Sequence, residues 1–498
     1  MSHYAKLVAH LRHGRLLMSC DQLLQWDQET LMPAGGGEHR AEQLSVLTGI
    51  AHRHGTSDER GELLERAGQE VGNDDSEAAA VIREAHHDFD RKRRVPAELA
   101  EEKVHTTSLA RQKWIEARKQ NDFALFLPHL EHIVDIERRY ADALGYEDHP
   151  YDALVAEYER GETAASVKEL LEPLRERVAA LLARILDSGK QADAAVLSRR
   201  YGVAAQAEFG RFGASAIGFD FGRGRLDTTT HPFCTGLGPN DVRLTTRYDE
   251  RNMADSYYST LHEAGHGIYE QGLGDKNFGT PLGDACSFGI HESQSRLWEN
   301  HVGRSRAYWS WLFPHVRERF PKVSEGTTAE EYYRANNDAH PSLIRVDADE
   351  VTYDLHIAIR FELEEKLLAA TLEPKDLPAA WNEAYARFLR VDPPTDTEGC
   401  LQDVHWSAGL FGYFPTYSLG NIYAAQLFDA ADRDLGGVHA QFAQGEFRPL
   451  KEWMNEKIHR HGRRYLPRDL VKRATGAAPT IEPMMGYLEA KFGELYEL

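Results

Sequence analysis

The sequence is poor in cysteine and has no long hydrophobic run. Its four cysteines, Cys20, Cys234, Cys286 and Cys400, are spread over 498 residues and form no CxxC pair. Disulfide-stabilised proteins are usually short and dense in cysteine, so this spacing predicts reduced thiols and a cytoplasmic location. The N-terminal region has no unbroken apolar stretch followed by a small-residue cleavage site, so we expect no signal peptide. No stretch of about 18 apolar residues occurs, so we expect no membrane-spanning segment.

Basic residues are outnumbered by acidic ones. The chain has 58 Lys and Arg residues against 79 Asp and Glu residues, a formal net charge of -21. So acidic a chain is poorly suited to neutralising phosphates, and nucleic acid is not expected as a partner. Hydrophobic residues make up 42% and charged residues 28% of the chain. These values are typical of a globular protein and argue against a disordered or fibrous one.

Most of the sequence has the apolar spacing of amphipathic helices. Apolar residues recur three and four positions apart from Tyr4 to Gln28 and from Glu38 to His54. Met32-Pro33 and the three glycines at 35–37 interrupt this pattern and predict a break between two helices. Further helices are expected near 58–70, 76–91, 97–119, 123–145 and 164–187, and again from about 252 to the end.

The pattern changes near residue 210. Residues 216–221 and 241–247 show the short alternation typical of strands, which predicts a small antiparallel sheet inside a helical protein. There is no repeat of fixed period and no low-complexity linker. The sequence therefore predicts one large, mainly α-helical unit, 1–498.

The strongest chemical signal is an HExxH motif at His262-Glu263-Ala264-Gly265-His266. Positions four apart lie on the same face of a helix, so His262 and His266 can bind one ion together. Glu263 would point to the side and reach a water on that ion. Asp255 or Asn252 is expected to cap this helix, and Gly272 and Gly274 to end it.

A catalytic zinc ion usually has three protein ligands and one open position. A helix expected from Ser287 to Gly303 offers Glu292, 26 residues after His266, and Glu299 two turns further along the same face. Spacing alone leaves both open as the third ligand, and a salt bridge to Arg296 is the alternative role for either. His291 lies about 100° round the helix from Glu292 and is expected to line the site instead.

Together with these residues, further short motifs make the chain resemble a known family, the Taq-type metallocarboxypeptidases. The resemblance begins at Trp26-Asp27-Gln28-Glu29-Thr30 and covers essentially the whole chain. Six short family motifs follow in order: His231-Pro232-Phe233, Asp241 to Thr245 (DxRxT), His262 to His266 (HExxH), His291 to Gln294 (HESQ), Ile344 to Asp349 (IRxxAD) and Gly399 to Trp406 (GxxQDxHW).

The resemblance implies properties that spacing does not give. Glu292 would be the third zinc ligand. The fold would resemble the neurolysin and angiotensin-converting peptidases, with a deep groove between two helical subdomains and a zinc-binding core at about 214–425. The enzyme would be a homodimer that removes single residues from peptide C-termini with broad specificity. A zinc oligopeptidase that cuts peptides internally is the alternative, and a helical scaffold protein that has lost catalysis is a second one.

The chemistry assigns roles to these groups. Zinc lowers the pKa of a bound water toward about 7, so Glu263 can act as general base and then as acid to the leaving amine. Cobalt or manganese can replace zinc at such a site. The oxyanion needs a further donor, for which Tyr413 and Tyr417 are the first candidates, followed by His231 and His405.

An exopeptidase must also recognise the substrate's terminal carboxylate, for which arginine is well suited. Arg345 is the first candidate and Arg243 the second. The alternative role for each is an ion pair with a neighbouring aspartate. Asp403 and Asp349 are both candidates for holding a zinc histidine by its second nitrogen, and the sequence does not decide between them.

Overall fold

The computed structural model describes residues 1–72 and 74–498. The chain divides into two compact units, each assembled from three separate segments. Unit 1 consists of Met1–Arg93, Asp193–Asn336 and Ala424–Ala478, and unit 2 consists of Arg94–Ala192, Asn337–Tyr423 and Pro479–Leu498. Because the chain passes between the units several times, no single linker separates them in the sequence. The expected core at about 214–425 contributes to both units, and the groove expected from the resemblance stays a prediction.

Unit 1 is helical with one small sheet, so the mainly α-helical prediction is confirmed. Its helices before the sheet are α1 (His3–Thr30), η1 (Ala34–Gly36), α2 (Gly37–Gly55), α3 (Asp58–Val71), α4 (Glu77–Arg94), η2 (Ala194–Val196) and α9 (Val203–Ile217). After the sheet come α10 (Met253–Gly272), η3 (Asp275–Asn277), η4 (Pro281–Gly283), α11 (Phe288–Arg296), η5 (Leu297–Gly303), α12 (Arg306–Arg319) and α13 (Ala329–Ala335). Its C-terminal helices are the second half of α16 (Pro415–Asp434), α17 (His439–Phe442), α18 (Arg448–Lys457), η9 (His459–Arg464) and α19 (Pro467–Thr475).

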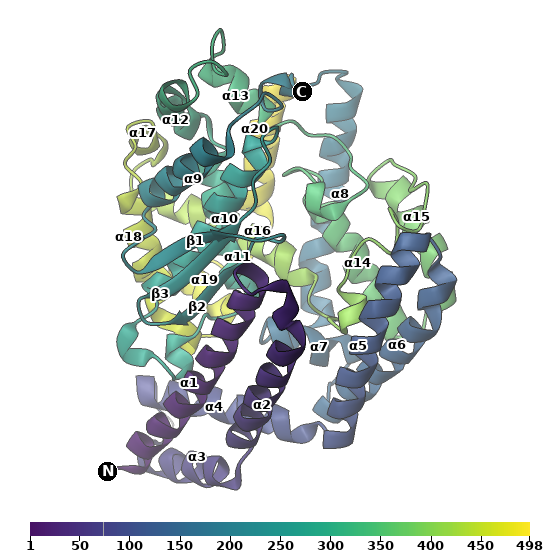
Figure 1. Ribbon diagram of the computed structural model, residues 1–498, viewed down its shortest axis with the longest axis vertical. Coiled ribbons are helices and arrows are strands. Elements are labelled where there is room, and N and C mark those ends of the chain that lie inside the picture. The colour runs from purple at the N-terminus through teal and green to yellow at the C-terminus, as the bar shows by residue number, and fades with distance from the viewer. Residues whose placement is uncertain (73) are drawn as a thin grey trace. The chain divides into compact units, whose positions relative to one another are not determined.

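The first two helices of unit 1 pair as a hairpin. α1 and α2 lie side by side (Figure 1), joined by the short η1 turn at the predicted Pro33 and glycine break. Arg40 of α2 fastens the pair, because its guanidinium donates to Leu24 O at 2.5 Å and to the Asp27 carboxylate at 2.6 Å. Arg40 is itself buried, so this contact belongs to the interior of the hairpin.

The sheet consists of β1 (Gly224–Thr228), β2 (Cys234–Gly238) and β3 (Asp241–Thr246), with β3 in the middle. β2 pairs with β3 antiparallel, but β1 pairs with β3 parallel, so the sheet is mixed and the prediction of an antiparallel sheet is wrong for that pair. The strand expected at 216–221 is also wrong. Ala216 and Ile217 end α9, and Gly218 closes that helix in the left-handed region at φ 109°. The apolar alternation there comes from a helix end that buries Ile217 and Phe219.

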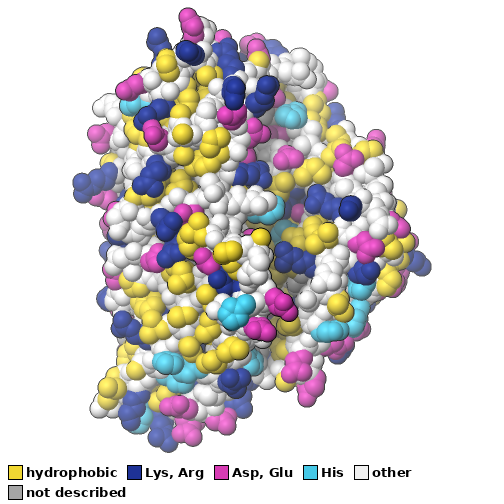
Figure 2. All heavy atoms as spheres, viewed as in Figure 1, with side chains coloured by type: hydrophobic (Ala, Val, Ile, Leu, Met, Phe, Trp, Pro, Cys, Tyr) yellow, Lys and Arg dark blue, Asp and Glu magenta, His cyan; other side chains and the backbone are white. Residues whose placement is uncertain are grey.

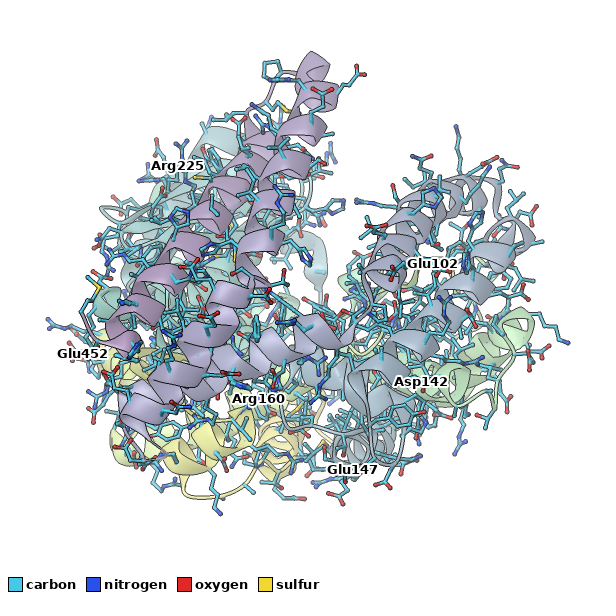
Figure 3. All side chains as sticks on the ribbon, turned by 90° about the horizontal axis from the view of Figure 1, so that it is seen from below. Glu102, Asp142, Glu147, Arg160, Arg225 and Glu452 are labelled. Atoms are coloured by element: carbon cyan, nitrogen blue, oxygen red, sulfur yellow. The ribbon has the colours of Figure 1, made fainter. Side chains whose placement is uncertain are left out.

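Unit 2 is entirely helical among its described elements. These are α5 (Ala97–Gln120), α6 (Phe123–Leu144), α7 (Pro150–Tyr158), α8 (Ala164–Asp187), η6 (Arg345–Asp347), α14 (Tyr353–Leu368), η7 (Pro374–Asp376), α15 (Leu377–Phe388), η8 (Trp406–Ala408), the first half of α16, and α20 (Glu482–Tyr496). α5 and α6 form a long hairpin, and Glu102, labelled in Figure 3, lies on α5. Arg139 of α6 donates a hydrogen bond to Glu102 at 2.7 Å.

The surface carries both signs of charge. Acidic and basic side chains are interspersed over the face shown in Figure 2. Within residues 1–72 and 74–498, no helix combines the length and the apolar character that a membrane crossing requires.

Candidate active site

The HExxH residues lie in the middle of α10. Asn252, one of the two caps that the sequence left open, caps this helix by accepting a hydrogen bond from the Asp255 backbone, and the helix ends at Gly272. The four-residue spacing places His262 and His266 on one face with ring centroids 4.9 Å apart. Gly267 on the same helix lets Phe219 and Leu244 approach closely, since a Cβ there would lie within 2.8 Å of both side chains. α10 therefore packs closely against the sheet.

A second glycine, Gly265, brings the helix that carries Glu292 close to the histidines. Ser287 caps α11 by accepting from the Ile290 backbone, so Glu292 lies in the helix that follows α10. A Cβ on Gly265 would lie 2.7 Å from both Gln294 O and Ser295 Cα, which are backbone atoms of α11. Only glycine allows α10 and α11 to pack this closely, and the close packing is what lets Glu292 reach the histidine face.

The three side chains converge on one point. Glu292 Oε2 lies 3.8 Å from His262 Nε2 and 3.6 Å from His266 Nε2. The ligand atoms of His262, His266 and Glu292 all lie within 4.8 Å of one another. Among the described residues, no other three His, Cys, Asp or Glu side chains are arranged to hold a metal ion. Two imidazoles and one carboxylate are the donor set of many catalytic zinc sites. These residues therefore fit a divalent cation.

Glu299 contacts the site from behind His262. Its Oε2 lies 2.9 Å from His262 Nδ1, on the opposite side of the ring from Glu292. Arg296 and Arg304 donate to the same carboxylate at 3.3 Å and 3.1 Å. Burial opposes ionisation of Glu299, but Arg296, His262 and Arg304 outweigh it and hold the pKa of this carboxyl well below its usual range. Glu299 is thus a partner of a predicted ligand, which the sequence did not anticipate.

Asp349 and Asp403, the two aspartates expected to hold a zinc histidine by its second nitrogen, have other partners. Asp349 accepts hydrogen bonds from Val351 N and Thr352 N and so shapes the turn before α14. Asp403 is bound by arginines in unit 2. The i to i+7 spacing of Glu292 and Glu299 places both carboxylates on one helix face, but it does not tell which of them binds the second nitrogen of His262.

The helix that carries Glu299 is not the single α-helix expected over 287–303. α11 stops at Arg296, and η5, Leu297–Gly303, continues as a π-helix. π-helical turns are rare and occur often at functional sites, where they change the direction in which side chains point. Glu299 is in this segment, so the irregular turn belongs to the site.

Burial governs the ionisation of the groups around the ligand atoms. Burial raises the pKa of the Glu263 carboxyl to about 7, opposed mainly by His262. Burial, together with His291 and His262, lowers the pKa of His266 well below its usual value, which favours the neutral ring that binds a metal ion. Burial also opposes protonation of His262, but Glu292 and Glu299 outweigh it and raise its pKa. A bound cation would act against this last shift by repelling the proton.

His291 packs against the site as expected, without offering a ligand atom to it. Its ring stacks on His266 with centroids 4.4 Å apart, and its Nε2 lies 3.0 Å from Glu270 Oε1. Glu270 in turn packs against Gly236 of β2, where a Cβ would lie 2.3 Å from the carboxylate. His291 therefore orients His266 and connects α11 with the sheet.

The two candidate substrate-binding residues of unit 1 are His231, in the loop between two strands, and Arg243, on β3. His231 is exposed in the loop between β1 and β2. Arg243 binds Asp241 through two hydrogen bonds of 2.9 Å, and its guanidinium lies 4.2 Å from the ring centre of Trp26. The ion pair that the sequence left open for Arg243 is thus present. Trp26 belongs to the segment where the family resemblance begins, so that segment packs on the sheet.

The remaining candidates meet in unit 2. Arg345 and Arg360 both bind Asp403, with nitrogen–oxygen distances of 2.9 Å and 2.6 Å. Burial opposes ionisation of Asp403, but the two arginines outweigh it and hold its pKa well below its usual range. Gln402 accepts from Arg345 N and from Arg360, which fixes the arrangement. Two guanidinium groups share one carboxylate, so this cluster keeps an excess positive charge.

His405, Tyr413 and Tyr417 surround this cluster. His405 Nε2 lies 3.2 Å from the Tyr417 hydroxyl, and the Arg345 guanidinium lies 5.1 Å from the Tyr417 ring centre. Tyr413 packs edge-on against Tyr417 with centroids 5.3 Å apart. Burial lowers the pKa of His405 to about 3, so its ring is neutral near pH 7. The structure therefore brings together four of the six predicted substrate-binding residues, Arg345, His405, Tyr413 and Tyr417.

A buried carboxylate missed by the sequence reading supports this group. Glu364 of α14 accepts hydrogen bonds from the Trp406 indole at 2.9 Å, the Tyr151 hydroxyl at 2.8 Å and the Gly412 backbone at 3.0 Å. These bonds fix the chain on both sides of the loop that leads to Tyr413. Burial raises the pKa of Glu364 to about 8, although its three hydrogen bonds oppose the shift.

Glu364 should make stability depend on pH. Because its folded pKa of about 8 lies above the ordinary value of 4.5, the folded protein keeps a proton that the unfolded chain releases between these values. Stability should therefore fall as the pH rises from about 4.5 to about 8. Glu364→Gln, which cannot ionise, should show a smaller decrease in unfolding temperature between pH 5 and pH 8. An equal decrease in both proteins would contradict this role.

The comparisons with known proteins agree with this geometry. The model of the carboxypeptidase Taq (M32) metallopeptidase family matches residues 6–492. The chain is 45% identical to thermostable carboxypeptidase 1 of Thermus thermophilus over 504 aligned residues, covering 99% of each chain, and 38% identical to carboxypeptidase 1 of Bacillus subtilis, covering 100% of this chain and 97% of that one. The crystal structure of the M32 carboxypeptidase of Deinococcus radiodurans matches with a TM-score of 0.97 at 42% identity, covering 100% of both chains.

The family match and the whole-length identities cover both groups of candidate residues. The HExxH helix with Glu292 in unit 1 and the cluster around Arg345 in unit 2 both lie within the matched range 6–492. The chain therefore belongs to the carboxypeptidase Taq family of metallopeptidases and is a metallocarboxypeptidase.

Proposed function

We propose that the protein removes single amino acids from the free C-termini of peptides, with one zinc ion held by His262, His266 and Glu292. The proposal is supported by the convergence of these three ligand atoms within 4.8 Å of one another. Glu263, adjacent to His262 in the sequence, is buried and is not one of the three. Zinc suits two imidazoles and one carboxylate, and cobalt or manganese would be accepted by the same donors.

Glu263 is proposed as the proton carrier. A bound divalent cation would acidify a water and polarise the scissile carbonyl. Glu263 takes the proton of the attacking water and gives it to the leaving amine nitrogen. Its burial suits this exchange, because desolvation raises the pKa of the carboxyl and makes it a better proton acceptor than an exposed carboxylate.

Arg345 is proposed as the group that recognises the substrate carboxylate. It shares Asp403 with Arg360, which leaves excess positive charge, and Arg360 is fully buried. Arg345 is the less buried of the two arginines, so it is the better placed for a ligand. Arg243 is a weaker candidate, because its guanidinium is paired with Asp241 and packed on Trp26.

The tyrosines next to His405 are proposed as donors to the developing oxyanion. Tyr417 is the first choice because neutral His405 lies within hydrogen-bond distance and can orient its hydroxyl. Tyr413 is the second, and exposed His231 of unit 1 is a further candidate. We also propose that the 498-residue chain acts as one catalytic unit, as a homodimer in the cytoplasm.

Metal removal and product analysis test the proposed function together. Treating the protein with a chelator should abolish hydrolysis, and adding zinc should restore it. A timed digest of one peptide with a free C-terminus should then show stepwise loss of single C-terminal residues by mass spectrometry. Early appearance of internal fragments would instead identify an oligopeptidase, and activity that survives complete metal removal would overturn the metal assignment.

Replacing Arg345 should separate carboxylate recognition from general catalysis. Arg345→Ala should raise KM for a free-carboxylate peptide about tenfold or more, because one charge-assisted contact is lost, and should change hydrolysis of its C-terminally amidated form much less. Asp403 keeps Arg360 as a partner, so the fold should survive. Arg139→Ala, which removes an exposed arginine of unit 2 paired with Glu102, is the control and should leave hydrolysis of both peptides near the parent rate. Equal losses for Arg345→Ala on both peptides would exclude Arg345 from this role.

A further inference from the structure

We propose that Arg296 and Glu299 form a bracket that fixes the orientation of two metal ligands, His262 and Glu292. The bracket would set metal affinity without either residue binding the ion. This inference rests on the proposed function, since it assumes that His262 and Glu292 bind a divalent cation.

One end of the bracket holds the His262 ring. Glu299 Oε2 lies 2.9 Å from His262 Nδ1, while His262 Nε2 faces Glu292. A carboxylate at one ring nitrogen keeps a proton there, which leaves the other nitrogen with a free lone pair. Glu299 therefore selects the tautomer of His262 that can bind the cation through Nε2.

The other end holds the Glu292 carboxylate. Arg296 donates from Nε to Glu292 Oε1 at 2.8 Å. Oε2 is the oxygen that lies 3.6 Å and 3.8 Å from the two imidazole Nε2 atoms. Because Arg296 occupies Oε1, Glu292 would offer a cation its other oxygen, Oε2. The bracket thus fixes which oxygen of Glu292 faces the two imidazoles.

The two ends are joined through one side chain. Arg296 also donates from Nη1 to Glu299 Oε2 at 3.3 Å, and Arg304 supports the other oxygen of Glu299 at 3.1 Å. Arg296 follows Glu292 by four residues and precedes Glu299 by three, so all three lie on one side of α11 and η5. Glu292 and Glu299 are buried, and water competes little for these hydrogen bonds.

His266 is oriented by other residues, so it serves as an internal comparison. Its ring stacks on His291 with centroids 4.4 Å apart, and His291 is held by Glu270. The bracket therefore acts on His262 and Glu292 and not on His266. Breaking it should disturb part of the ligand set and leave the third ligand in place.

The test measures metal affinity directly. The zinc dissociation constants of the parent protein, Glu299→Gln and Arg296→Lys are measured by competition with a chromophoric chelator. Glu299→Gln should bind zinc about 10–100-fold more weakly, because the amide keeps the shape of the side chain but loses the charge that holds His262. The visible absorption spectrum of the Co²⁺ form should also change, since the orientation of His262 changes.

Asp88→Asn is the matched control. Asp88 is also a carboxylate of unit 1, and it accepts two hydrogen bonds of 2.7 Å from Arg463, which is not part of the bracket. It should leave zinc affinity and the Co²⁺ spectrum unchanged. Arg296→Lys keeps the contact of Glu299 with His262 but frees Glu292 Oε1, and it serves as the test if Glu299→Gln does not fold.

The outcomes separate this inference from the proposed function. If the parent protein binds no zinc or does not remove C-terminal residues, the proposed function fails. If the parent binds zinc and is active, but the folded variants bind zinc within twofold of the parent and keep its Co²⁺ spectrum, the bracket alone is overturned.

Discussion

Replacing Glu263 with glutamine is expected to reduce kcat by about 10²–10⁴-fold, the usual contribution of a general base and acid. Glutamine has nearly the same shape but cannot accept the proton of the attacking water. Glu263 contributes no atom to the three-residue ligand group, so zinc content should stay at the parent level. The measurement is peptide hydrolysis at saturating substrate, with bound zinc determined by elemental analysis on the same samples.

Asp255→Asn is the control for this experiment. Asp255 lies in the first turn of the same helix and pairs with Arg247, so its loss changes a charge on α10 without touching the ligands. Its kcat should remain near that of the parent. If Glu263→Gln keeps normal turnover with matched zinc content, Glu263 is not the base.

Adding one methyl group to Gly265 is expected to damage both stability and metal binding. The new Cβ in Gly265→Ala would lie 2.7 Å from Gln294 O and Ser295 Cα, and neither backbone atom can move without moving α11. Overpacking of this kind typically costs about 1–3 kcal/mol. Because α11 carries Glu292, we expect zinc affinity to fall at least about tenfold, with a lower unfolding temperature, measured by chelator competition and by thermal unfolding.

Gly68→Ala provides the comparison within unit 1. Gly68 is also inside a helix, α3, but a Cβ there would meet only Ile82 Cγ2, at an ordinary 3.9 Å. Alanine favours the helix by up to about 1 kcal/mol relative to glycine, so stability should be unchanged or higher. Zinc binding by Gly265→Ala equal to that of Gly68→Ala would show that the close packing of α10 and α11 is not required.

The helices and the ligand group were largely predictable from the sequence, because both depend on local spacing. The periodicity of 4–28 and 38–54 matches α1 and α2, and the HExxH spacing placed His262 and His266 on one helix face. Sequence spacing left Glu292 and Glu299 open as ligands. The structure separates them, since Glu292 faces the Nε2 atom of His262 and Glu299 faces its Nδ1 atom.

The errors in the sequence reading arose where contacts between distant segments decide the structure. The parallel pairing of β1 with β3 depends on which strands meet, and alternation within one strand does not encode this. The run at 216–221 resembles a strand, but the left-handed Gly218 makes it a helix end. The role of Glu364 was missed because its partners, Tyr151, Trp406 and Gly412, lie 213, 42 and 48 residues away.

The interleaved composition of the two units has a consequence for biosynthesis. Unit 1 needs residues 1–93 and also 424–478, and unit 2 receives its last helix, α20, from the segment after 478. A ribosome delivers the chain from the N-terminus, so neither unit is complete until nearly the whole polypeptide has been translated. Until then Tyr308 and Trp311 of α12 lack Phe447, the late ring against which both pack, and exposed apolar surface of this kind is what chaperones bind.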